Sequence, residues 1–149
     1  MRMDLYIIAK QYRNAIDEAK YRGEFHRKDR KLGWDRMMNF PNGCCDDACD
    51  LLGYYLKEKY GIATKQVVGR YDIGAFEELT NHVWLITSTN IIIDITGDQF
   101  EGNSCVYVGP ENDFYMRMGK ECIQENYDIK KDVRLKSDYD IIFEYLDVI

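Results

Sequence analysis

Three short segments stand in order between residues 43 and 96: Gly43-Cys44-Cys45, Asn81-His82-Val83-Trp84 and Ile91-Ile92-Ile93-Asp94-Ile95-Thr96. The first precedes an amphipathic run, which predicts a cysteine at the start of a helix. The other two have the apolar, β-branched composition of strands. A thiol nucleophile needs a base to ionise the sulfur and a carboxylate to orient the base. We therefore expect Cys45, His82 and Asp94 to form a catalytic triad.

The chain around these segments predicts an α+β fold, in which N-terminal helices pack on a mostly antiparallel β-sheet and a further helix lies at the C-terminus. Apolar residues recur at helical spacing over residues 3–21 and again over residues 44–60, as they do on one buried helix face. Ser137 followed by Asp140 is the pattern of a capping box at the start of the last helix. Residues 109–136 carry no clear period.

Strand-like runs follow the second helix and predict the sheet. They cover residues 64–71, 82–87, 91–95 and 104–108. The short link Ser88-Thr89-Asn90 predicts a β-hairpin, so the second and third runs should pair antiparallel. Such a hairpin can place Asp94 opposite or diagonal to His82 on one sheet face. A carboxylate in an apolar strand needs a partner of this kind, because burying an unpaired charge is costly.

Composition indicates one globular domain over residues 1–149. The chain has 46% hydrophobic and 31% charged residues, which excludes a disordered polymer. Its formal net charge of −6 argues against nucleic acid or an anionic membrane as the main partner. Residues 22–31 are locally basic and are interpreted as a solvated linker, with a substrate-steering patch as the alternative.

Targeting and redox features predict a cytoplasmic protein. No run approaches the roughly 20 apolar residues of a membrane-spanning helix, and residues 1–5 contain no apolar block of a signal peptide. The five cysteines lack framework spacing, which favours free thiols in a reducing compartment. Export without a cleavable signal would leave the same pattern.

Two adjacent cysteines compete for the role of nucleophile. Cys44 and Cys45 differ by about 100° around a helix, so they cannot both face one site. A helix N-terminus favours a thiolate and can stabilise an oxyanion, because its N–H groups are unpaired. Periodicity mildly favours Cys45. The other thiols are expected in the core, namely Cys49, Cys105 and Cys122. A zinc site of the first three cysteines with His82 is a weaker alternative, because no C-x-x-C pair is present, and nothing predicts a cofactor or metal.

The same segments resemble the core of the transglutaminase-like (papain-like) cysteine enzymes, in particular small bacterial members. The family pattern is Gly-x-Cys at a helix start, Gly-Ile-Pro-Ala-Arg and Val-x-Gly-Tyr on a strand, His-x-Trp, and Asp-x-Thr. The matching positions here are Gly43 and Cys45, Gly61-Ile62-Ala63-Thr64-Lys65, Val67 and Gly69, His82 and Trp84, and Asp94 and Thr96. The resemblance implies a papain-like/transglutaminase-like fold and selects Cys45 over Cys44. Ala63-Thr64-Lys65 departs from Pro-Ala-Arg, and the family tyrosine is displaced to Tyr71, so no subfamily is assigned.

These features predict acyl transfer at an amide bond of a peptide or protein, by a peptidase, amidase, deamidase or transglutaminase. The backbone N–H of Cys45 is the expected first oxyanion donor, and Asn42 and Gln99 are candidates for the second. Trp84 and Phe40 either flank the cleft or belong to the core. The alternative hypothesis is a non-catalytic binding or regulatory module that retains the fold, with a triad that is either vestigial or structural.

Overall fold

The computed structural model describes residues 4–27, 36–72 and 79–146. It has the α+β architecture expected from the sequence. The α-helices are α1 (Leu5–Tyr21), α2 (Cys45–Tyr60), α3 (Asp113–Met116) and α4 (Val133–Leu146). The strands are β1 (Thr64–Asp72), β2 (Leu79–Thr87), β3 (Ile92–Asp94), β4 (Tyr107–Gly109) and β5 (Gly119–Gln124). Short 3₁₀ helices are η1 (Glu24–Arg27), η3 (Arg36–Asn39), η4 (Gly97–Gln99) and η5 (Ile129–Lys131).

The strands form one five-stranded sheet in the order β4-β3-β2-β1-β5, and each neighbouring pair is antiparallel. The predicted hairpin is confirmed, because β2 and β3 pair Leu85 with Ile93 and Ile86 with Ile92. Asn90 adopts φ 65° in the connecting turn, a left-handed conformation that asparagine tolerates better than most residues.

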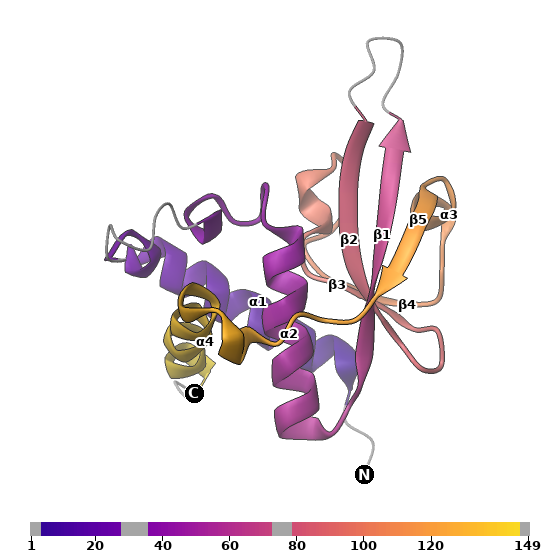
Figure 1. Ribbon diagram of the computed structural model, residues 1–149. Helices are drawn as coiled ribbons and strands as arrows, with labels where there is room; N and C mark the ends of the chain where they lie inside the picture. Colours follow the sequence, from indigo (N-terminus) through magenta and orange to yellow (C-terminus); the bar gives the residue numbers. More distant parts are fainter. Residues whose placement is uncertain (1–3, 28–35, 73–78, 147–149) are drawn as a thin grey trace.

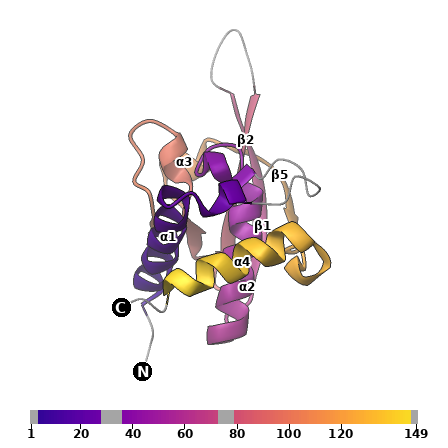
Figure 2. The same cartoon turned by 90° about the vertical axis from the view of Figure 1, so that its left-hand side faces the viewer.

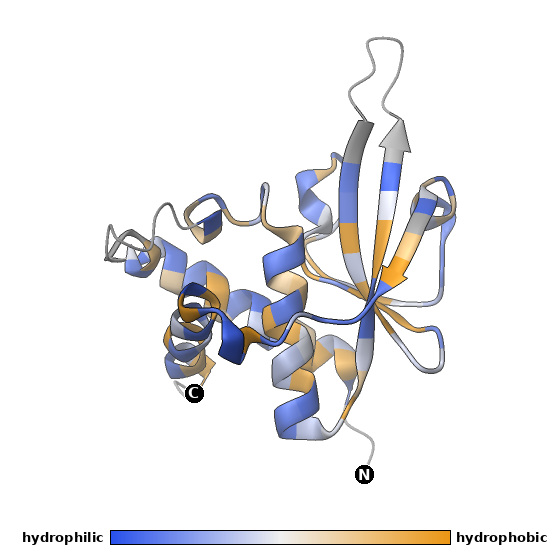
Figure 3. Cartoon of the chain, in the orientation of Figure 1, coloured by the Kyte–Doolittle hydropathy of each residue, from blue (hydrophilic) through white to orange (hydrophobic). Residues whose placement is uncertain are grey.

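The long helices α1, α2 and α4 gather on one side of the sheet, with α2 between the strands and the pair α1 and α4 (Figure 1). Seen from that side, α4 crosses in front of α2 (Figure 2). The large core between these elements includes Ile16, Leu52, Val83 and Leu85. Figure 3 shows apolar residues, in orange, on both the helices and the strands. Burial of this apolar surface is the main force that docks the helices on the sheet.

A second, smaller cluster forms around Trp84 and Ile92, with Val67, Tyr115 and Met118. Side chains alternate between the two faces of a strand. Since Val83 and Leu85 belong to the helical core, Trp84 lies on the other face, and His82 shares its parity. The helix α2 packs on the face that carries Val83 and Leu85.

The C-terminal third holds elements that the sequence left open. The helix α3, the strand β5 and the turn η5 all fall within residues 109–136. The predicted start of the last helix at Ser137 is wrong, because α4 begins at Val133. Asp132 caps it instead, and its Oδ1 accepts the N–H of Leu135 at 3.1 Å.

Part of the predicted basic linker, residues 28–31, lies outside the described residues. Its described part includes the 3₁₀ helix η1, Glu24–Arg27. Across residues 4–27, 36–72 and 79–146, no helix combines the length and the apolar character needed to cross a membrane.

Candidate active site

Cys45 is the first residue of α2, as the sequence predicts. Gly43 precedes it with φ 72°, a left-handed conformation that favours glycine. The turn before the helix therefore depends on that residue. The helix ends at Gly61, which is also left-handed with φ 68°. The N–H groups of the first turn have no acceptor within an α-helix, so the end that carries Cys45 attracts negative charge.

The two adjacent cysteines have different environments. Cys44 is fully buried, and burial followed by the negative charge of Asp47 raises its pKa to about 12. Cys45 is half-buried. Cys49 lies one turn further along α2, donates its S–H to the carbonyl oxygen of Val83 at 3.5 Å, and has a pKa raised well above the ordinary value by burial. Of Cys44, Cys45 and Cys49, Cys45 is the thiol that is only partly buried.

The imidazole of His82 lies between Asp94 and Cys45. Its Nε2–H donates to Oδ2 of Asp94 at 2.7 Å, and the side chains of both residues are buried. The side chain of Cys45 approaches the ring and contributes to raising its pKa. Because Leu85 pairs with Ile93, Asp94 is diagonal to His82 on the hairpin, one of the two predicted arrangements.

Burial and charge act in opposite directions on this pair. Burial by itself lowers the pKa of His82, but the charge and hydrogen bond of Asp94, with a smaller contribution from Cys45, raise it to about 9. Burial by itself raises the pKa of Asp94, but the charge of His82 and the hydrogen bonds to the carboxylate hold it below the ordinary value. The ring is therefore protonated at neutral pH and the carboxylate is ionised.

Asp94 has two further partners, which explains how a carboxylate remains charged inside the fold. The backbone N–H of Thr96 donates to Oδ1 at 3.0 Å. The hydroxyl of Tyr115 donates to Oδ2 at 2.7 Å. Sequence reasoning missed Tyr115 because it lies in α3, a helix of four residues, which is too short to produce a periodic pattern.

Aromatic rings surround His82. The ring centroid of Trp84 lies 5.6 Å from that of the imidazole, and Phe100 and Phe114 lie at 5.0 and 6.2 Å with edge-on geometry. Trp84 is 1% exposed, so it supports the imidazole from the core. A Cβ on Gly69 would come within 2.8 Å of the Trp84 ring, which explains the glycine at that position of β1.

The candidate oxyanion residues have different positions. The side-chain amide of Gln99 lies 3.1 Å from Nδ1 of His82, at the nitrogen that Asp94 does not use. Asn42 is exposed in the turn before α2, and its backbone N–H donates to the carbonyl of Asn39 at 2.8 Å. Phe40 is buried at 1% exposure and belongs to the core. The site thus brings together Cys45, His82, Asp94 and Gln99.

Comparisons of the chain with protein-family models, with curated proteins and with solved structures find no match. Within the part of the chain that the structure describes, no three or more His, Cys, Asp or Glu side chains are grouped to hold a metal ion. The chemistry of the site is therefore derived from its own geometry.

Proposed function

We propose that this protein is a cysteine-dependent enzyme that transfers the acyl group of an amide through a thioester on Cys45. The observation that carries the proposal is the buried ring of His82, which donates to Asp94 at 2.7 Å and whose pKa is also raised by the nearby Cys45. In this arrangement, the carboxylate of Asp94 orients the imidazole of His82, and the imidazole takes the proton of the Cys45 thiol. The amide of a peptide or protein is the substrate class that such a nucleophile attacks.

The proposal includes the fold. A helix that begins with the nucleophile and is followed by antiparallel strands bearing the histidine and the aspartate is the order of papain-like and transglutaminase-like enzymes. Here Cys45 begins α2, His82 lies in β2 and Asp94 ends β3. This order supports the resemblance noted from the residues alone.

The proposed reaction has two steps. Before the substrate binds, the thiol proton of Cys45 already resides on Nδ1 of His82, so the sulfur is a thiolate beside the protonated ring. The thiolate then attacks the carbonyl carbon, the C–N bond breaks, and Nδ1–H protonates the leaving amine. In the second step, water or an amine attacks the thioester while His82 takes its proton. The C–S bond breaks, which releases an acid or a new amide and restores the thiolate beside the protonated ring.

The oxyanion of the tetrahedral intermediate needs donors near the sulfur. The backbone N–H of Cys45 is the first, because it belongs to the first turn of α2. Gln99 is the better candidate for the second, since its amide already lies 3.1 Å from the catalytic nitrogen of His82. We expect Gln99→Ala to lower kcat by about 100-fold if the amide donates to the oxyanion.

Alkylation of the thiols tests the proposal without a substrate. The rate of iodoacetamide labelling at Cys45, followed by peptide mass spectrometry near pH 6, should exceed that of a model thiol. His82→Ala should abolish the excess, because no base then ionises the sulfur. Cys44→Ser is the matched control, since Cys44 is buried with a pKa of about 12, and it should leave the rate at Cys45 unchanged.

A labelling rate at Cys45 equal to that of the model thiol, and insensitive to His82→Ala, would favour a binding module over an enzyme. Where labelling is fast, the subclass follows from the products. Ammonia release from glutamine-containing peptides indicates a deamidase, incorporation of an added amine indicates a transglutaminase, and new peptide termini indicate a peptidase.

A further inference from the structure

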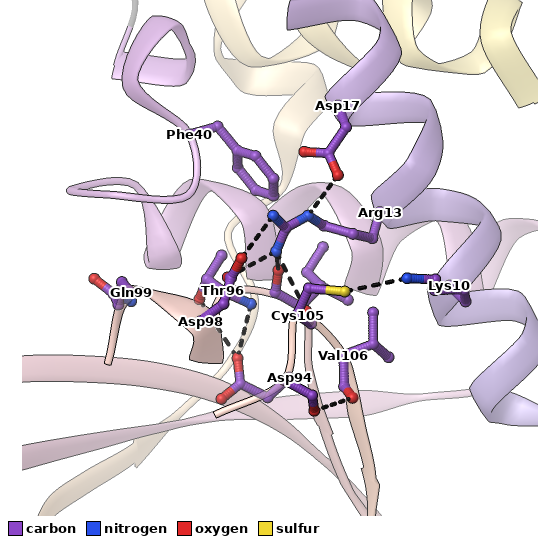
Figure 4. Close-up of polar contacts among 12 residues, drawn as sticks. Lys10, Arg13, Asp17, Phe40, Asp94, Thr96, Asp98, Gln99, Cys105 and Val106 are labelled. Carbon is purple, nitrogen blue, oxygen red and sulfur yellow. Dashed lines mark hydrogen bonds and ion pairs between the residues drawn. The ribbon is translucent and has the colours of Figure 1, made fainter. Parts of the chain in front are cut away.

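The side chain of Arg13 lies in the middle of a polar network that the triad does not use. It comes from α1 and is 5% exposed, although arginine is almost never buried unless it is paired. Figure 4 shows its guanidinium between the helix and the segment that follows Asp94. Nε donates to Asp17 at 3.0 Å, and Nη1 and Nη2 donate to the two carboxylate oxygens of Asp98 at 2.8 and 2.9 Å.

The guanidinium of Arg13 also donates to two backbone carbonyl groups, one directly after Asp94 and one further along the chain. Nη1 donates to the carbonyl oxygen of Ile95 at 2.8 Å and to that of Cys105 at 3.3 Å. The carbonyl of Ile95 and the N–H of Thr96 belong to one peptide group, which is planar and rigid. That N–H donates to Oδ1 of Asp94 at 3.0 Å. Arg13 therefore fixes and polarises the peptide group that orients the carboxylate of the triad.

The other end of the same turn meets the opposite side of the imidazole. Asp98 is followed directly by Gln99, whose amide lies 3.1 Å from Nδ1 of His82. Asp94 takes Nε2. The two residues that contact the two ring nitrogens thus flank the segment 95–98, and Arg13 binds both ends of that segment.

Arg13 also contacts the segment that leads to the nucleophile. Its guanidinium carbon lies 4.8 Å from the centroid of the Phe40 ring, a cation–π distance. Lys20, also from α1, donates to the carbonyl of Phe40 at 2.6 Å. Phe40 lies five residues before Cys45. Arg13 thereby contacts both the segment that precedes Cys45 and the segment that follows Asp94.

We propose that Arg13 is a positioning residue for the reaction: it holds the turn 95–98 so that Asp94 and Gln99 stay on the two ring nitrogens of His82. The catalytic part of this inference rests on the proposed function. The effect of Arg13 on the titration of His82 can be measured independently of that function. A lysine cannot replace the guanidinium, because it lacks the planar fork that binds Asp98 through two nitrogens while donating to a backbone carbonyl.

The test compares Arg13→Lys with Asp17→Asn. Both alter the contact between residue 13 and Asp17, but Asp17 lies on α1 four residues away and does not belong to the turn 95–98. The chain has two histidines, so His26→Gln in every variant leaves His82 as the single imidazole. Ring ¹⁵N chemical shifts then give its tautomer and titration midpoint, and iodoacetamide labelling gives the reactivity of Cys45.

We expect Arg13→Lys to lower the titration midpoint of His82 by about one pH unit, which corresponds to the loss of well-oriented contact with Asp94. Labelling of Cys45 should slow by about tenfold, because small misplacements of reacting groups cost this much or more. Asp17→Asn should leave both within the error of the parent. Where Arg13→Lys does not fold, Asp98→Asn removes the charged anchor of the turn and should shift both readouts in the same direction.

The inference would be overturned if Arg13→Lys, or Asp98→Asn in its place, showed the same His82 titration and Cys45 labelling as Asp17→Asn. This holds even if the variant were less stable. The two proposals fail separately. Slow labelling of Cys45 in the parent would contradict the enzymatic function. Fast labelling in the parent, together with a His82 titration that Arg13→Lys leaves unchanged, would contradict only the role of Arg13.

Discussion

Asp94→Asn tests the charge that keeps His82 protonated inside the fold. The pKa of His82 is raised from its ordinary value of 6.5 to about 9. At about 1.4 kcal/mol per pKa unit, this difference corresponds to roughly 3 kcal/mol of folding free energy carried by the ring proton. Asparagine keeps the size of the side chain and an acceptor for the ring N–H, but it removes the negative charge. Burial, which lowers the pKa of His82, is then opposed only by the smaller contribution of Cys45.

The sign of the pH dependence follows from the direction of the shift. Because the pKa is higher in the folded state, the contribution of His82 is fully present below pH 6.5 and is lost as the pH rises through about 9. Asp94→Asn lacks this contribution. The difference in unfolding free energy between the wild type and the variant should therefore shrink by about 3 kcal/mol over this range.

Urea denaturation at a series of pH values between 6.5 and 9.5 or so measures this difference. Asp140→Asn is the matched control, because Asp140 pairs with Lys136 on an exposed surface of α4 and such pairs contribute about 0–1 kcal/mol. The reasoning is refuted if the stability difference between the wild type and Asp94→Asn is the same at both ends of the range.

Two further substitutions test the support around the triad. Tyr115→Phe removes the hydroxyl that donates to Asp94 at 2.7 Å and should lower the unfolding free energy by about 2 kcal/mol. The control Tyr107→Phe removes a hydroxyl that donates to the exposed carbonyl of Pro110 and should lower the unfolding free energy clearly less. Equal losses for the two variants in urea denaturation would contradict the role of Tyr115. Gly69→Ala would place a Cβ within 2.8 Å of the Trp84 ring and should cost about 1–3 kcal/mol by overpacking, which thermal or urea unfolding would detect; an unchanged stability would show that the ring moves aside freely.

The features of the fold that the sequence predicts correctly are those that depend on local patterns of residues. The helix that begins at Cys45 and the hairpin that holds His82 and Asp94 were predicted because periodicity and turn length act over a few residues. The start of α4 was not, because Asp132 offered the N-cap one turn before the Ser137 pattern. Several residues able to cap a helix stood within one stretch, and tertiary packing selected among them.

The support of the site was harder to predict, because it depends on contacts between distant segments. Arg13 and Asp98 are 85 positions apart, and nothing local distinguishes Arg13 from an ordinary charged residue on a helix. Tyr115 lies 21 positions from Asp94 in a stretch without a clear period. Charged and hydroxyl groups acquire such roles only when the chain folds, so their positions in the sequence carry no signal.

The division of the apolar interior into two clusters has a thermodynamic consequence. The sheet separates the helical core from the aromatic cluster around Trp84, so side chains in one cluster share few neighbours with those in the other. The effects of substitutions placed on opposite sides should therefore add independently. A change of side-chain size around the imidazole can alter local chemistry while the contribution of the three long helices to folding stays constant.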